Sequence, residues 1–158
     1  MSGSLRRFWR IEVRYFDTSA LVKQYFVEPG SALVRELLET GEKVFTAGMT
    51  YAETHAAFAR RRREGVLSPR ITRRLALRFD KDWETYEVVL LNQEVLNQAR
   101  QIVYRHKLRS ADAIHLASAL LLAKRTHEPK SQFVCADLRL REAASLEGLH
   151  PIDPTTPE

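Results

Sequence analysis

Apolar and polar residues alternate along the chain in two repeating patterns. Short apolar runs predict strands over residues 14–17, 43–47, 86–91 and 131–136, with a further edge strand over 148–152. Between them, apolar residues recur every three or four positions, which predicts helices over residues 18–25, 31–41, 50–65, 93–106, 110–126 and 138–146, and one that starts at Pro69. Since strands alternate with helices throughout, we expect an α/β fold: a three-layer sandwich whose central, mostly parallel sheet of four or five strands is flanked by helices.

Polar residues mark where several of these helices begin. Thr50 followed by Glu53 has the spacing of a capping box, which predicts a helix start at Thr50. Ser110 is the expected N-cap of the helix over 110–126, which places Asp112 in the first turn.

The chain length suits one domain with one core, which we assign to residues 14–152. Residues 1–13 are rich in arginine but lack the apolar stretch of a secretory signal, so we expect an N-terminal extension, either disordered or a basic arm. Residues 153–158 are rich in Pro and Thr and are expected to form a flexible tail.

Composition narrows the class of protein. The formal charge of +5 favours a polyanionic partner such as nucleic acid. The single Cys135 rules out an internal disulfide and a cysteine-based zinc site, and we expect a reducing, cytoplasmic setting. No apolar run approaches the roughly 20 residues that cross a bilayer, so we expect no membrane association.

Four acidic residues carry the candidate chemistry. Asp17 and Asp137 each follow a predicted strand, whereas Glu53 and Asp112 each lie at the start of a predicted helix. Each has a structural alternative as a helix cap or first-turn acid. However, ligands of parallel sheets bind beyond the carboxyl ends of the strands, and carboxylates gathered there repel one another unless a cation neutralises them. The pattern therefore predicts a site for Mg2+ or Mn2+, with one or two ions.

The segments around these acids resemble the successive motifs of a PIN domain, and most closely those of VapC toxins from toxin–antitoxin pairs. The resemblance is carried by residues 15–23, Thr50-Tyr-Ala-Glu53, residues 108–117 and residues 133–140, and it extends over residues 14–152. It implies a PIN-like sandwich and an Mg2+- or Mn2+-dependent endoribonuclease that cleaves tRNA or another translation-related RNA. It also implies a homodimer and a VapB-like antitoxin that blocks the site.

The resemblance also assigns roles to residues. It implies that Asp17 and Asp112 are the principal metal ligands, and that Glu53 and Asp137 complete the site. Thr18 or Ser19 occupies the hydroxyl position after the first acid, where it is expected to bond a ligand carboxylate or a water. Cys135 departs from the family pattern, because many relatives carry Thr or Ser there, and a lost hydroxyl would weaken the ordering of the ligands.

Further residues have two interpretations each. Arg109 and the run of Arg60, Arg61, Arg62 and Arg63 could contact RNA phosphates or the antitoxin, and the run could equally be a solvated surface. His115 is interpreted as a hydrogen-bonded core residue rather than a general base. Leu33, Leu37 and Leu38, with Tyr25 and Phe26, could expose an apolar patch to a partner.

Other functions remain as alternatives to a toxin. One is a stand-alone PIN-domain nuclease that processes RNA, and another is a non-catalytic PIN-like module that binds RNA or protein. A phospho-accepting receiver domain also places acids at strand ends. That class is disfavoured, because we find neither paired acids after the first strand nor a lysine after the last.

Overall fold

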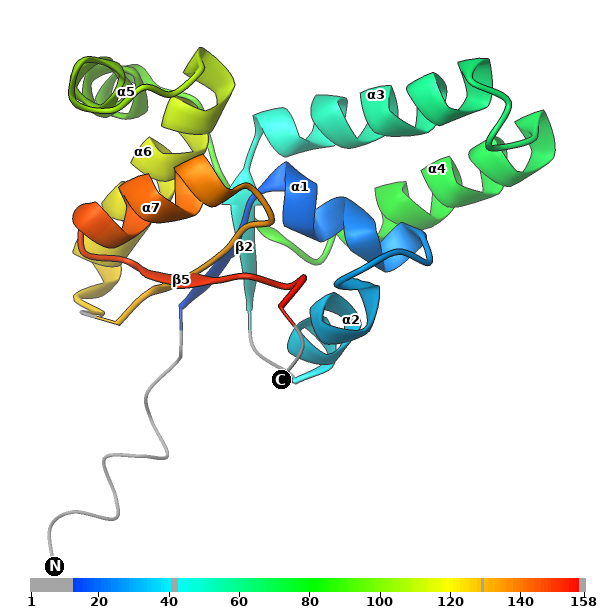
Figure 1. Cartoon of the computed structure of the whole chain (residues 1–158), viewed down its shortest axis with the longest axis horizontal. Helices are drawn as coiled ribbons and strands as arrows, with labels where there is room; N and C mark the ends of the chain where they lie inside the picture. The colour runs from blue at the N-terminus through cyan, green and yellow to red at the C-terminus, as the bar shows by residue number, and fades with distance from the viewer. Residues whose placement is uncertain (1–12, 41–42, 129, 157–158) are drawn as a thin grey trace, which may run out of the picture.

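The computed structural model describes residues 13–40, 43–128 and 130–156, which form a central sheet between two layers of helices (Figure 1). In the described residues the sheet has five strands in the order β3-β2-β1-β4-β5, and neighbouring strands pair in parallel. The strands are β1 (Arg14–Phe16), β2 (Val44–Ala47), β3 (Glu87–Val89), β4 (Gln132–Val134) and β5 (His150–Ile152). The predicted α/β sandwich with a parallel sheet is confirmed.

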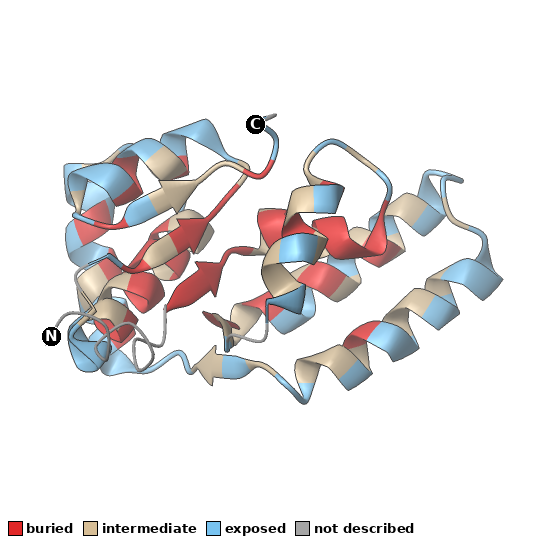
Figure 2. Cartoon of the chain, turned by 90° about the horizontal axis from the view of Figure 1, so that it is seen from below, coloured by how far each residue is buried: buried red, intermediate tan, exposed pale blue. Residues whose placement is uncertain are grey.

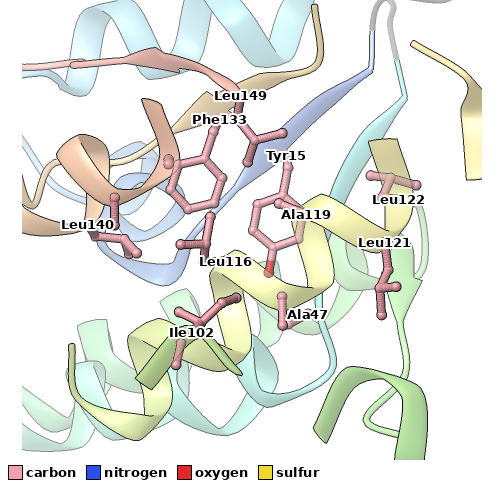
Figure 3. Close-up of a cluster of buried hydrophobic side chains, with 14 of the residues drawn as sticks. Tyr15, Ala47, Ile102, Leu116, Ala119, Leu121, Leu122, Phe133, Leu140 and Leu149 are labelled. Atoms are coloured by element: carbon pink, nitrogen blue, oxygen red, sulfur yellow. The ribbon is translucent and has the colours of Figure 1, made fainter. Parts of the chain in front are cut away.

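Successive strand residues point to opposite faces of the sheet, and this alternation divides the core into two clusters. Tyr15 and Phe133 belong to one cluster, where their rings stack with centroids 5.5 Å apart (Figure 3). Their neighbours Phe16 and Val134 belong to the other cluster. The first cluster is covered by α5 (Gln93–Arg105), α6 (Ser110–Thr126) and α7 (Leu138–Leu146).

The second face is covered by the remaining helices. These are α1 (Thr18–Leu21), the 3-10 helix η2 (Val22–Tyr25), α2 (Ser31–Glu39), α3 (Met49–Arg63) and α4 (Pro69–Trp83). The helices α3 and α4 form a hairpin that extends away from the sheet, and much of its surface is exposed (Figures 1 and 2). Phe58 and Phe79 bury the base of this hairpin against Tyr25.

Strands β1 and β4 are neighbours in register, with Phe16 opposite Val134. The residues that follow them therefore leave the sheet at the same edge, and the backbone N–H of Asp17 donates to the Val134 carbonyl at 3.1 Å. This pairing brings together two ends of the chain that lie more than one hundred residues apart, and it positions the candidate site.

Two predicted N-caps are wrong, although the predicted bounds of the helix over residues 110–126 are those of α6. The helix α3 begins at Met49 with Gly48 as its N-cap, so Thr50 and Glu53 form no capping box. The Thr50 hydroxyl is buried and lies 2.8 Å from the Thr46 hydroxyl. This hydrogen bond engages the hydroxyl that a helix cap would need. The N-cap of α6 is Arg109 rather than Ser110, although Asp112 does lie in the first turn.

The start of the described chain and its C-terminal segment pack against the domain. Val13 is buried in the core, whereas residues 1–12 of the predicted extension, like residues 41–42, lie outside the described part. In the predicted tail, Asp153 pairs with Arg141 at 3.0 Å and Pro154 is buried. Gly30 makes room for this segment, since a Cβ atom there would lie 2.9 Å from the Pro154 carbonyl oxygen.

The predicted apolar patch is wrong for its aromatic members. Tyr25 and Phe26 are buried in the second cluster, and Leu37 and Leu38 are partly buried against it. Within the residues that the structure describes, every helix is too short or too polar to cross a lipid bilayer.

Candidate active site

Asp17 lies directly after β1 and caps α1. Its Oδ1 accepts a hydrogen bond from the Ala20 amide at 3.0 Å, and the Ser19 hydroxyl lies 2.8 Å from each carboxylate oxygen. The residue is only 4% exposed, and burial raises the pKa of its carboxyl, against the lowering effect of the nearby His115 and of these hydrogen bonds. The cap predicted from sequence is therefore present, and it fixes this carboxylate at the edge of the sheet.

Asp112 and Asp137 share an electrostatic environment with Asp17. Asp137 is exposed and caps α7, and its Oδ1 accepts from the Leu140 amide at 2.9 Å. Burial raises the pKa of Asp112, and the negative charges of Asp137 and Asp17 raise it further, while Arg109 and His115 act in the opposite direction. The fold thus gathers three acids from the ends of two neighbouring strands and the first turn of α6.

Glu53 reaches this region from α3, in the other helical layer. Its Oε1 accepts from the Thr18 hydroxyl at 2.7 Å and lies 2.8 Å from His115 Nε2. Burial alone would raise the pKa of Glu53, but the hydrogen bonds from His115 and Thr18 outweigh burial and lower it. Glu53 is therefore held in one place as an ionised carboxylate.

His115 of α6 connects the two helical layers through its contacts with Glu53 and Tyr15. It is 2% exposed, and its Nδ1 lies 2.8 Å from the Tyr15 hydroxyl. An ionised Glu53 only accepts hydrogen bonds, so the hydrogen-bond network assigns a proton to Nε2. Burial raises the pKa of Tyr15, so its hydroxyl stays protonated beside Nδ1. The interpretation of His115 as a hydrogen-bonded core residue is confirmed, but its contact with Glu53 was missed.

A signal for this contact exists in the sequence. His115 lies within a run of small and apolar residues over 113–119, most of which are buried as part of α6. A polar side chain buried in such a helix requires hydrogen-bond partners, and the acids of the predicted site are suitable partners for a histidine.

Ser19 and Cys135 connect the ends of β1 and β4. The Ser19 hydroxyl accepts from the Ala136 amide at 3.2 Å, and the Cys135 thiol donates to Asp17 Oδ2 at 3.2 Å. Cys135 sulfur also accepts from the Asp137 amide at 3.3 Å. Burial raises the pKa of Cys135 well above its ordinary value, so the side chain is a neutral thiol that can donate. The thiol therefore makes the contact expected of a hydroxyl at this position.

The arginines predicted to contact RNA or an antitoxin lie in two parts of the molecule. Arg109 Nε lies 3.8 Å from Asp112 Oδ2, beside the acids. The run from Arg60 to Arg63 lies at the C-terminal end of α3. At 1.5 Å per residue, the run begins about 10 Å from Glu53 along the helix axis. Within the run, Arg61 donates to Glu28 at 2.9 Å and stacks 3.6 Å from the centroid of Phe26, so its guanidinium is already engaged.

The chemical nature of the available donors suits a hard divalent cation. The carboxylate oxygens of Asp17, Asp112 and Asp137 are ligands of this kind, and their mutual repulsion is what such an ion relieves. Softer donors are engaged elsewhere, because both His115 nitrogens and the Cys135 thiol make hydrogen bonds. In the described part of the chain, no three His, Cys, Asp or Glu side chains form a ready metal-binding group. The acids fit a cation in type and charge without forming a closed cage.

The chain is similar to known proteins over most of its length. The PIN domain family model matches residues 14–145. The chain is 33% identical over 138 residues to Ribonuclease VapC45 of Mycobacterium tuberculosis, which covers 85% of this chain and 90% of that protein.

Several solved structures share the fold, including the following two. A toxin–antitoxin complex from Klebsiella pneumoniae matches with a TM-score of 0.63 at 16% identity, over 89% of this chain and 97% of the other. VapC20 of Mycobacterium tuberculosis, a toxin that cleaves the sarcin-ricin loop, matches with a TM-score of 0.59 at 17% identity, over 82% and 94%.

Proposed function

This chain belongs to the PIN domain family, and we propose that it is a metal-dependent endoribonuclease and the toxin of a VapBC-type toxin–antitoxin pair. The observation that carries the proposal is the shared electrostatic environment of Asp17, Asp112 and Asp137. A structural core has no need to hold an acid whose pKa is raised by two neighbouring carboxylates, whereas a nuclease that binds a cation does.

The proposed metal ligands are Asp17 and Asp112, with Asp137 and Glu53 in support. A bound Mg2+ or Mn2+ supplies an activated water and neutralises negative charge on the phosphodiester. The chain's own residues prepare this site, because Ser19 and Cys135 fix the Asp17 carboxylate through hydrogen bonds. By family resemblance, the expected products carry a 5′-phosphate and a 3′-hydroxyl.

In this proposal Glu53 acts as the general base. Thr18 and His115 keep it ionised and oriented, so its carboxylate can accept a proton from a water that attacks the phosphodiester. Arg109, whose side chain is 90% exposed beside Asp112, is available to contact a substrate phosphate.

The proposed substrate is RNA of the translation machinery, such as tRNA, in keeping with the net positive charge. The proposed partners are a VapB-like antitoxin that blocks the site and a second copy of the chain. These follow from membership of the VapC group of ribonucleases.

Substitution of the two principal ligands tests the proposal. Asp17→Asn and Asp112→Asn should each abolish Mg2+-dependent cleavage of RNA while circular dichroism shows an unchanged fold. Glu94→Gln is a matched control, because Glu94 is an acid that pairs with Arg125 at the other end of α6 from Asp112. Full activity of either aspartate variant would reject the assignment.

A further inference from the structure

A groove of about 400 Å³ lies between the loop that joins α5 to α6 and the helix α7. Its lining includes three cationic residues, Arg105, Lys107 and Arg139, and one acid, Glu142. Arg105 is paired with Glu147 at 3.2 Å, and the same carboxylate lies 2.9 Å from His106 Nε2. Lys107 and Arg139 are exposed, and neither has an ion-pair partner among the described residues.

Two of the cations that line the groove lie next in the chain to segments of the candidate active site. Arg139 lies two residues after Asp137 on α7, and Lys107 lies two residues before Arg109, which contacts Asp112. The two segments that carry Asp112 and Asp137 therefore also carry the unpaired cations.

We propose that this groove binds the RNA backbone on one side of the scissile phosphate, an inference that rests on the proposed nuclease function. A cluster of carboxylates repels a polyanion, so the phosphates next to the cleaved one need cations close to the site. Arg109 beside Asp112, together with Lys107 and Arg139 in the groove, supplies such charges close to the acids. Contacts of this kind read the backbone and not the bases, so they favour no particular RNA sequence.

RNA suits the groove better than an acidic peptide does. The substrate must extend from the carboxylates over the adjacent surface, and this surface holds cations that no acid of the described chain neutralises. The run over Arg60–Arg63 is the other candidate for contacts with RNA. It lies farther from Glu53 along α3, and Arg61 within it is paired with Glu28.

The test measures RNA binding in the absence of cleavage. A fluorescent single-stranded RNA is titrated with protein in EDTA at several salt concentrations. The double variant Lys107→Gln/Arg139→Gln should weaken binding about tenfold, and the slope of log K against log salt should fall by about 1.4, since each phosphate contact on a single strand contributes about 0.7.

The double variant Lys124→Gln/Lys130→Gln is the matched control. It removes the same net charge near the C-terminal end of α6, away from Asp112, and should bind RNA almost as the wild type does. Wild-type binding by the groove variant, or equal weakening by the control, would overturn the proposal. Loss of antitoxin binding with unchanged RNA binding would reassign the groove to a peptide.

Binding and cleavage separate this proposal from the proposed function. If the wild type fails to cleave RNA with Mg2+ or Mn2+ but its binding still depends on Lys107 and Arg139, the groove stands and the nuclease does not. If cleavage occurs and the groove variant binds normally, the nuclease stands and the groove does not.

Discussion

The Cys135 thiol donates a hydrogen bond to Asp17 Oδ2 across 3.2 Å, between the ends of two neighbouring strands. The same sulfur accepts from the Asp137 amide, so one side chain orders both strand-end acids. The residue that departs from the family pattern therefore retains the hydrogen bond that a hydroxyl would make.

Replacement of Cys135 should show whether activity depends on its hydrogen bond to Asp17 or on the sulfur atom itself. We expect Cys135→Ser to keep kcat/KM for RNA cleavage within a few-fold of wild type, because a hydroxyl still donates to Asp17. Cys135→Ala should lower it by about tenfold or more, the usual cost of losing a group that orients a metal ligand. Equal activity of the alanine variant and the wild type, with thermal stability measured alongside, would contradict this role.

Removal of the His115 contact should change the pH dependence of cleavage. His115 and Thr18 lower the pKa of Glu53, which burial alone would raise, so in the wild type Glu53 stays ionised to a pH below its usual pKa of 4.5. In His115→Leu the acidic limb of the pH–rate profile should move to higher pH, together with a loss of at least tenfold in rate. His115→Gln, which retains a donor, should shift the limb less. A profile unchanged in the leucine variant would exclude a positioning role.

Asp112→Asn should stabilise the metal-free protein. Burial, Asp137 and Asp17 raise the pKa of Asp112, so the stability linked to its protonated form is lost as pH rises through that pKa. At pH 7 the asparagine variant should gain up to about 1 kcal/mol, which corresponds to about 2–4 °C in Tm for a chain of this size. Differential scanning fluorimetry in EDTA measures this gain.

The same experiment with Mn2+ reports on metal binding without any activity assay. Added Mn2+ should raise the Tm of the wild type and leave the Tm of Asp112→Asn almost unchanged. Equal shifts in both proteins would show that the ion binds elsewhere.

Gly30 should be sensitive to substitution because of the C-terminal segment. It has φ of +92°, and an added Cβ would meet the Pro154 carbonyl oxygen at 2.9 Å. Gly65 also has a positive φ, of +75°, but nothing lies within 4 Å of its Cβ position. Gly65→Ala should cost about 1 kcal/mol for the backbone alone, and Gly30→Ala should cost clearly more. Urea denaturation compares the two, and equal losses would mean that the Pro154 contact contributes nothing.

Arg61 should differ from its neighbours in the arginine run. It pairs with Glu28, whose pKa is lowered because the bonds from Arg61 and Lys23 outweigh the effect of burial. Arg61→Gln should cost about 1 kcal/mol at pH 7, while the exposed Arg62→Gln should cost almost nothing. Because a lowered pKa adds stability only above the unfolded value, the difference should shrink as pH falls below about 4.5. A difference that persists at low pH would point to the stacking of Arg61 on Phe26 instead.

Most of the architecture could be predicted from local patterns. The alternation of apolar strands with amphipathic helices predicts the parallel sheet, because each element must bury one face or stripe. The errors at Thr50 and Ser110 are of a different kind. Both hydroxyl residues suit a cap, but Thr50 makes a buried contact with Thr46, a residue of the preceding strand. The residues at the helix start do not predict such a contact.

The sequence by itself determined the acids, their places at strand ends and helix starts, and the family to which the chain belongs, since these depend on residue types at short spacings. Only the tertiary structure decided that the charges of Asp17 and Asp137 act on Asp112. It also decided that Glu53 is held by His115. It also decided that Cys135 takes the place of a hydroxyl, and that Arg61 is engaged. These relationships join residues that are far apart in the chain, and the sheet order β3-β2-β1-β4-β5 sets the distances between them.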